Sequence, residues 1–274
     1  MTKTVVSASY RTDIPAFYGD WFARRLAAGH ALVRNPWSGS AYRVNLAPDA
    51  VAGYVFWTRN PAPFMPVLAG LERPFVVQFT ITGYGRRLEP SVPAPGRAVE
   101  AAHALAALYG PRCVVWRYDP ILSPTQDHVE AAGRLAEMLR GATDECVVSF
   151  ASFYRKTARN LAAAGFAWED PEPDRRLQLI EALADAVSPL RLTVCAQPEL
   201  TGGAAEPARC IDPARLGLGP LPEKGNRPGC ACAASRDIGA YDTCPHGCLY
   251  CYANASPGAA RRRFKAHDPE AEML

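Results

Sequence analysis

The stretch CVVWRYDP, residues 113–120, sets the pattern from which the fold is predicted. Its first four residues are apolar, which is typical of a short strand buried on both faces, and polar residues come next, where that strand would end. Residues 128–139 then have the apolar spacing of a helix. A buried strand followed by a helix is one βα unit of a parallel sheet.

The same unit recurs along the chain. Strands are predicted over residues 4–9, 31–34, 54–57, 75–81, 113–116, 146–150 and 190–195, and helices over 19–28, 97–109, 128–139, 157–164 and 174–187. No Gly-rich dinucleotide turn follows the first strand. The series therefore favours an α/β fold of the TIM-barrel type, or a partial (β/α) barrel, over a doubly wound sheet.

Polar residues follow the predicted strands, and in a barrel those strand ends would meet at one mouth. The residues expected to face a common cavity there are Arg11, Asp13, Asn35, Asn60, Thr80, Arg117, Asp119 and Gln197. Two Arg-x-Asp pairs stand out as candidate catalytic residues: Arg11 with Asp13, and Arg117 with Asp119. They suit a clamp on a carboxylate or phosphate, although buried ion networks are an equal interpretation.

The periodic pattern ends near Gln197, and Gly, Pro and Cys dominate the segment after it. We therefore expect residues 1–197 to form the barrel body, and residues 198–274 a Cys-rich iron-sulfur segment that completes the same domain. The net charge of +3 is too small to indicate a nucleic-acid or membrane surface, and it does not exclude a nucleic-acid partner. No apolar run approaches the length of a membrane helix, and no signal peptide is evident, so a cytoplasmic protein is expected.

Nine cysteines in a reducing compartment are better explained by metal binding than by disulfides. Three lie in the segment DTCPHGCLYCYA, residues 242–253, which we name the cysteine loop: Cys244, Cys248 and Cys251. Three thiolates on one tight loop can ligate three irons of a 4Fe-4S cluster and leave the fourth iron open. A zinc site with His246 as fourth ligand is the alternative, but zinc sites usually pair cysteines at two-residue spacings.

Four more cysteines, Cys195, Cys210, Cys230 and Cys232, form the group that we name the four-cysteine group. They would suit a second 4Fe-4S cluster or a closed zinc site, or some are ordinary buried thiols. Cys113 and Cys146 lie within predicted apolar strands and are expected in the core.

The CxxxCxxC spacing of the cysteine loop is similar to that of the radical S-adenosylmethionine superfamily. In that superfamily the open iron binds S-adenosylmethionine, and the aromatic residue before the third cysteine, here Tyr250, flanks the adenine. The motifs YRTDIPAFYGDWF, VFWTRNP, WRYDPIL and CACAASRDIGAYDTCPHGCLYCYAN resemble a bacterial family known as a domain of unknown function, whose C-terminal cysteines have been likened to that superfamily. Within the superfamily, CLYCYAN most resembles spore photoproduct lyase.

The superfamily's cysteine loop normally follows the first barrel strand, whereas here it is C-terminal. A circular permutation would account for this, with residues 237–241 as the preceding strand and residues 256–266 as the following helix.

The resemblance implies a radical enzyme that generates a 5′-deoxyadenosyl radical to attack an unknown substrate, a small molecule or otherwise, with flavodoxin or ferredoxin as electron donor. Its reaction could belong to the lyase, transferase or oxidoreductase class. The alternatives are an iron-sulfur electron-transfer or sensing protein and a zinc-stapled binding module.

Overall fold

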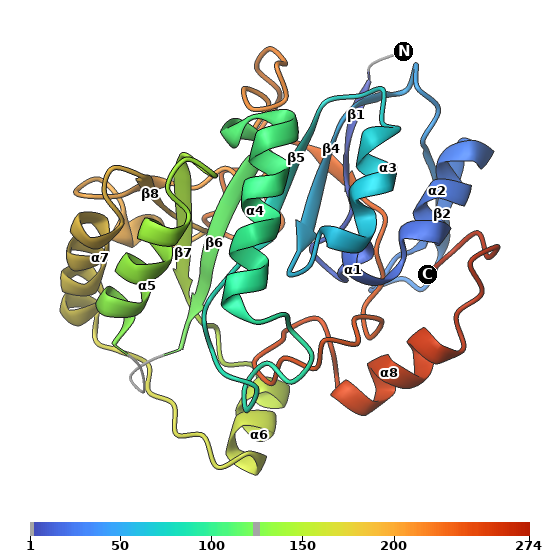
Figure 1. The fold of residues 1–274 in the computed structure, drawn as a ribbon. Helices are drawn as coiled ribbons and strands as arrows, with labels where there is room; N and C mark the ends of the chain where they lie inside the picture. Colours follow the sequence, from blue (N-terminus) through green and yellow to red (C-terminus); the bar gives the residue numbers. More distant parts are fainter. Residues whose placement is uncertain (1–2, 123–126) are drawn as a thin grey trace.

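The computed structural model describes residues 3–122 and 127–274, and its centre is an eight-stranded parallel sheet (Figure 1). The strands lie in the order β10-β1-β4-β5-β6-β7-β8-β9. Their bounds are Ser235–Asp237 for β10, Thr4–Ser7 for β1, Val51–Thr58 for β4, Phe75–Thr80 for β5, Val114–Ile121 for β6, Glu145–Phe150 for β7, Arg191–Val194 for β8 and Glu206–Pro207 for β9.

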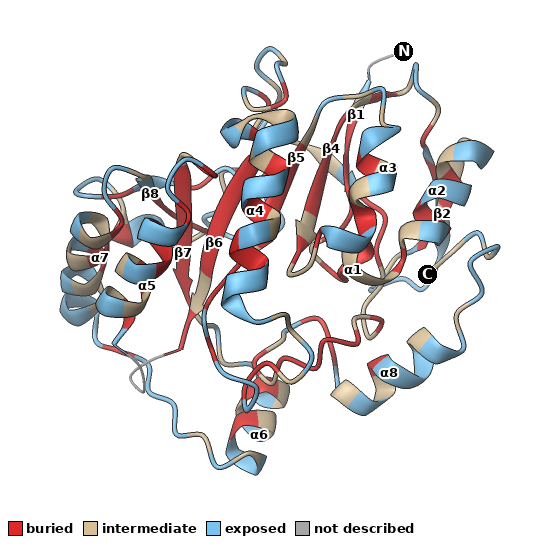
Figure 2. Cartoon of the chain, in the orientation of Figure 1, coloured by how far each residue is buried: buried red, intermediate tan, exposed pale blue. Residues whose placement is uncertain are grey.

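Helices cover one face of this sheet, which we name the helix face. The α-helices of the chain are α1 (Ile14–Phe17), α2 (Gly19–Ala28), α3 (Met65–Ala69), α4 (Pro95–Tyr109), α5 (His128–Met138), α6 (Arg155–Ala163), α7 (Pro173–Val187) and α8 (Pro257–Lys265). Figure 2 shows α4, α5 and α7 with buried residues toward the strands and exposed residues away from them. The five predicted helices of the barrel body are thus confirmed, with ends shifted by at most two residues.

The opposite face, which we name the coil face, is covered by residues 208–233. Alternation along each strand separates the two faces, so that Val76 packs toward the coil and Val77 toward the helices. The buried coil-face set consists of Val5, Val55, Val76, Val115, Val147, Cys195, Ala208, Cys210, Ile211, Leu216, Cys232 and Ala233. The Cys-rich segment is therefore the packing partner of the strands on this face.

The sheet is not closed, so the prediction of a complete TIM barrel is not confirmed. Its edge strands β9 and β10 have only two and three residues, and the connection between them lies on the coil face. Closure would require those edges to pair. In the order of the sheet, β10 precedes β1 and pairs with it in parallel, although it is the last strand of the chain.

The predicted strand over residues 31–34 does form, but its expected place in the main sheet is wrong. It is β2 (His30–Arg34), which pairs antiparallel with β3 (Ala41–Asn45) in a separate two-stranded sheet. A short turn joins the two strands, and such a turn cannot connect parallel neighbours. Asn35 consequently lies in this turn, where its side chain accepts hydrogen bonds from the backbone of Trp37 and Ser38, and not at the mouth.

No helix among the described residues is long and apolar enough to cross a membrane.

Truncation of Ile211 tests whether the coil segment is an integral part of the core. Its side chain is fully buried on the coil face, so Ile211→Ala is expected to lower the free energy of unfolding by about 2–5 kcal/mol. The matched control is Leu177→Ala on α7, where the side chain is 41% exposed and a change within about 0.5 kcal/mol is expected. Urea unfolding followed by circular dichroism measures both, and equal effects would contradict this packing of the coil against the sheet.

Candidate functional site

The cysteine loop follows β10 and lies at the C-terminal ends of the parallel strands. Figure 1 shows this C-terminal segment, in red, below the sheet between α6 and α8. Backbone hydrogen bonds attach it to the segment after β5, from Leu249 N to Leu88 O at 3.0 Å and from Ser91 N to His246 O at 3.1 Å. Gly247 adopts a φ of 79°, which favours glycine and lets the loop reverse direction between its first two cysteines.

The three loop thiols are buried or half-buried, and they lie close enough to influence one another. Cys248 is buried, whereas Cys244 and Cys251 are half-buried. Burial raises the pKa of Cys248 to about 12, against the lowering effect of Arg59, and burial also raises the pKa of Cys244 and of Cys251. The free thiols are therefore protonated, and a metal would have to displace their protons on binding.

His246 lies between the first two cysteines, but its ring is committed to other partners. Nε2 lies 2.8 Å from Asp13 Oδ2, and Nδ1 lies 3.1 Å from the carbonyl oxygen of Ser91. Only 2% of the residue is exposed. His246 therefore anchors the loop to the segment after β1, and it would have to break a hydrogen bond to ligate a metal.

Asp13 is a buried junction between three segments. One carboxylate oxygen caps α1 by accepting from Ala16 N, and the other accepts from Arg59 N at 2.8 Å as well as contacting His246. Arg11 forms its ion pair elsewhere. Its Nε lies 3.1 Å from Asp237 Oδ1, in a buried ion pair that joins the segment after β1 to β10.

A second buried network lies beside the cysteine loop. Arg59 forms an ion pair with Glu89 at 2.7 Å and also donates to the Tyr250 hydroxyl, which in turn donates to Glu89. Thr82 donates to the same carboxylate oxygen at 2.7 Å. These contacts fix the aromatic side chain that precedes the third cysteine.

The four-cysteine group lies on the coil face, against the second Arg-x-Asp pair. Cys195 Sγ and Cys210 Sγ are 3.8 Å apart. Arg117 donates to Cys210 Sγ at 2.9 Å and pairs with Asp119 at 2.6 Å, while Ser149 donates to the other oxygen of that carboxylate. Arg117 and Asp119 thus pair with each other next to sulfur, an arrangement compatible with either interpretation of the pair.

Three further residues expected at the mouth, Gln197, Asn60 and Thr80, lie at or just beyond the ends of strands. Gln197 accepts a hydrogen bond from Phe150 N at 2.7 Å, and Asn60 accepts one from Ala62 N at 3.4 Å. Thr80 lines a cavity of about 150 Å³ together with Thr82 and Glu89. This cavity adjoins the cysteine loop through the contact of Glu89 with Tyr250.

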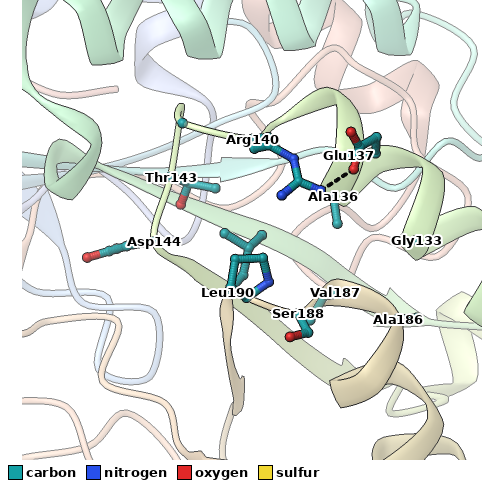
Figure 3. Close-up of a pocket in the computed structure, with 12 residues that line it drawn as sticks. Gly133, Ala136, Glu137, Arg140, Thr143, Asp144, Ala186, Val187, Ser188 and Leu190 are labelled. Atoms are coloured by element: carbon teal, nitrogen blue, oxygen red, sulfur yellow. Dashed lines mark hydrogen bonds and ion pairs between the residues drawn. The ribbon is translucent and has the colours of Figure 1, made fainter.

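A larger cavity of about 260 Å³ lies at the opposite, N-terminal ends of the strands, where β7 and β8 begin. Figure 3 shows its lining from α5 and α7, including the ion pair of Arg140 with Glu137. None of the predicted site residues lines it.

Sequence reasoning missed Arg59, Glu89, Asp237 and Arg227. Arg59 follows a predicted strand, which is a usable signal, but Glu89 lies in a Gly- and Pro-rich stretch with no periodicity. Only the folded chain brings Arg59 to Glu89, Asp237 to Arg11, and Arg227 to Cys195. Cys113 and Cys146 are buried in the core as expected, and all nine cysteines, each of them described, are free. In the described part of the chain, no group of three or more His, Cys, Asp or Glu residues stands ready to hold a metal ion.

Substitution of Glu89 tests the network beside the cysteine loop. Glu89→Gln removes the negative partner of a buried guanidinium, so a loss of about 3–5 kcal/mol in the free energy of unfolding is expected. Glu130→Gln is the matched control, because Glu130 pairs with Arg134 on an exposed helix surface, where the loss should stay below about 1 kcal/mol. Denaturant titration measures both variants, and similar losses would show that the buried pair has no special role.

Comparison with known proteins gives a family but no relative of defined activity. No curated protein and no solved structure matches the chain significantly. A family model matches residues 5–253, from β1 through the end of the cysteine loop. Because this match spans most of the sequence, the chain belongs to the family described as a domain of unknown function (DUF1848).

Proposed function

We propose that this protein is a radical S-adenosylmethionine enzyme whose 4Fe-4S cluster is ligated by Cys244, Cys248 and Cys251. The observation that carries the proposal is the donor set of the cysteine loop. Three free thiols lie on one loop, while the imidazole between them is held by Asp13 and Ser91. Three sulfur donors without a fourth ligand suit a cluster that keeps one iron open.

The same observation disfavours the zinc alternative at this loop. A structural zinc site takes four protein ligands, and His246 is the residue that would complete it. Recruiting His246 through Nε2 would leave the buried Asp13 carboxylate without one of its partners, at a cost in free energy.

Burial raises the pKa of the loop thiols, and two nearby cations oppose that effect. Arg59 and Lys156 lower the pKa of Cys251, and Arg59 lowers that of Cys248, in both cases against the larger effect of burial. When bound, the cluster would supply the electron for reductive cleavage of S-adenosylmethionine.

The protein's own share would be binding, orientation and exclusion of water. Tyr250 is held by Arg59 and Glu89 and would present its ring to the adenine. Arg117 and Asp119 lie in the second half of β6, toward the strand ends where the cysteine loop lies. We propose that these two side chains contact the substrate.

Anaerobic reconstitution with iron and sulfide tests the proposal. The reduced protein is expected to give an EPR signal that changes when S-adenosylmethionine is added, and 5′-deoxyadenosine should accumulate with reductant. Cys244→Ala should abolish both the change in the signal and the product. Cys113→Ala, which removes a core thiol outside the loop, should retain both.

The outcomes separate the alternatives. A cluster whose signal ignores S-adenosylmethionine, without 5′-deoxyadenosine, would overturn the proposal in favour of an electron-transfer or sensing protein. Zinc bound at the loop in place of iron would favour a zinc-stapled module.

The ring of Tyr250 gives a second prediction. Base stacking on an aromatic ring contributes about 1–3 kcal/mol, so Tyr250→Ala should weaken binding of S-adenosylmethionine by about 5- to 150-fold. Tyr250→Phe keeps the ring and should keep most of the affinity, although it removes the hydroxyl contacts with Arg59 and Glu89. Calorimetric titration of the reconstituted protein measures both, and equal losses in the two variants would contradict the assigned role of the ring.

A further inference from the structure

The four-cysteine group brings together thiols from three separate segments of the chain. Cys195 directly follows β8, Cys210 follows β9, and Cys230 and Cys232 lie in the connection that leads to β10. Cys195 and Cys210 are in contact, and Cys232 interacts through its side chain with both Cys210 and Cys230. The four thiols therefore lie in one neighbourhood on the coil face.

Hydrogen-bond donors point at these sulfur atoms. Arg117 donates to Cys210 Sγ at 2.9 Å, Arg227 to Cys195 Sγ at 3.5 Å, and the backbone of Ile211 to Cys232 Sγ at 3.4 Å. Donors and positive charges of this kind stabilise metal-bound thiolates. Neutral core thiols behave as small apolar groups and do not require them.

The backbone is wound tightly around the group. A Cβ atom at Gly225 would lie 2.3 Å from the carbonyl oxygen of Cys230, and one at Gly229 would lie 2.7 Å from Pro198 Cδ. Gly229 also has a φ of 74°. Glycine at both positions lets the connection fold closely around the cysteines, where a long coil has little regular structure of its own.

We propose that Cys195, Cys210, Cys230 and Cys232 ligate a second 4Fe-4S cluster through all four of their sulfur atoms. Each thiol loses its proton on binding iron, and inorganic sulfide completes the cluster. Among the described residues these thiols are not yet arranged as a metal site. Binding of the cluster would therefore have to draw their sulfur atoms closer together. The ligation does not depend on the proposed function of the cysteine loop.

Iron and sulfide are favoured over zinc by spacing and by location. Structural zinc sites usually contain cysteine pairs separated by two to four residues, whereas Cys230 and Cys232 are separated by one and the other two are dispersed. Tyr252, next to Cys251 in the chain, interacts electrostatically with Arg117 and Arg227, the two cations that contact this group. A redox-active centre here would lie beside the cysteine loop and relay electrons to it, a role that does rest on the proposed function.

The test uses the full chain with the first site removed. In the triple variant Cys244→Ala, Cys248→Ala and Cys251→Ala, anaerobic reconstitution should still yield about four iron and four sulfide per chain, with the EPR signal of a reduced cluster. Adding Cys210→Ala to the triple variant should abolish both. Adding Cys146→Ala, which removes a buried thiol outside the group, should leave the iron content unchanged.

Three results would overturn the proposal: a folded triple variant that binds no iron, stoichiometric zinc without sulfide, or full iron content after the change at Cys210. Circular dichroism establishes that each variant is folded. If Cys210→Ala is not, Cys230→Ala replaces it, because Cys230 is the most exposed thiol of the group and its loss should disturb packing least. Loss of iron from that variant would then support the proposal, and full iron content would overturn it.

Discussion

The architecture depends on the pairing of β10 with β1, two strands from opposite ends of the chain. Asp237, the last residue of β10, secures this pairing. Its buried carboxylate accepts hydrogen bonds from Ser9 Oγ, Tyr10 N and Gly239 N and forms the ion pair with Arg11. Burial raises the pKa of this carboxyl, and Arg11 together with hydroxyl and backbone donors opposes that effect. Removing Arg11 would leave a charge poorly compensated in the interior.

That pairing positions both sets of thiols. The cysteine loop starts shortly beyond β10. Because the strands are parallel, it lies at the same end of the sheet as Arg11, Asp13 and the residues that follow β4 and β5. The connection before β10 crosses the coil face and brings three of the four-cysteine group against Cys195. Each set is thereby placed among side chains from which it is separated in sequence.

Guanidinium groups are the common feature of the two cysteine sets. Arg59 interacts with Cys248 and Glu89 beside the cysteine loop, and Arg117 and Arg227 contact sulfur in the four-cysteine group. Arginine keeps its charge when buried and carries several donors in a fixed plane, so it can hold a carboxylate and a sulfur atom at once. The ion pair with Arg59, for example, compensates the negative charge of Glu89, which is buried in the interior.

The sequence predicted the local elements well because strand and helix periodicity are local properties. It also anticipated the separation of Cys113 and Cys146 from the other cysteines. The sequence-based prediction failed where long-range geometry determines the structure. β2 has the composition of a barrel strand, yet a short turn pairs it with β3 in a separate sheet. The main sheet stays open, and a coil without periodicity covers one of its faces. Glu89 and Arg227 were missed because polar contacts made from a loop leave no pattern in sequence.

Iron-edge anomalous diffraction from crystals of anaerobically reconstituted protein tests the central claim most directly. Iron is expected on the sulfur atoms of Cys244, Cys248 and Cys251, with His246 still hydrogen-bonded to Asp13. Iron absent from the cysteine loop, or His246 turned away from Asp13 to complete a zinc site with the three thiols, would contradict it.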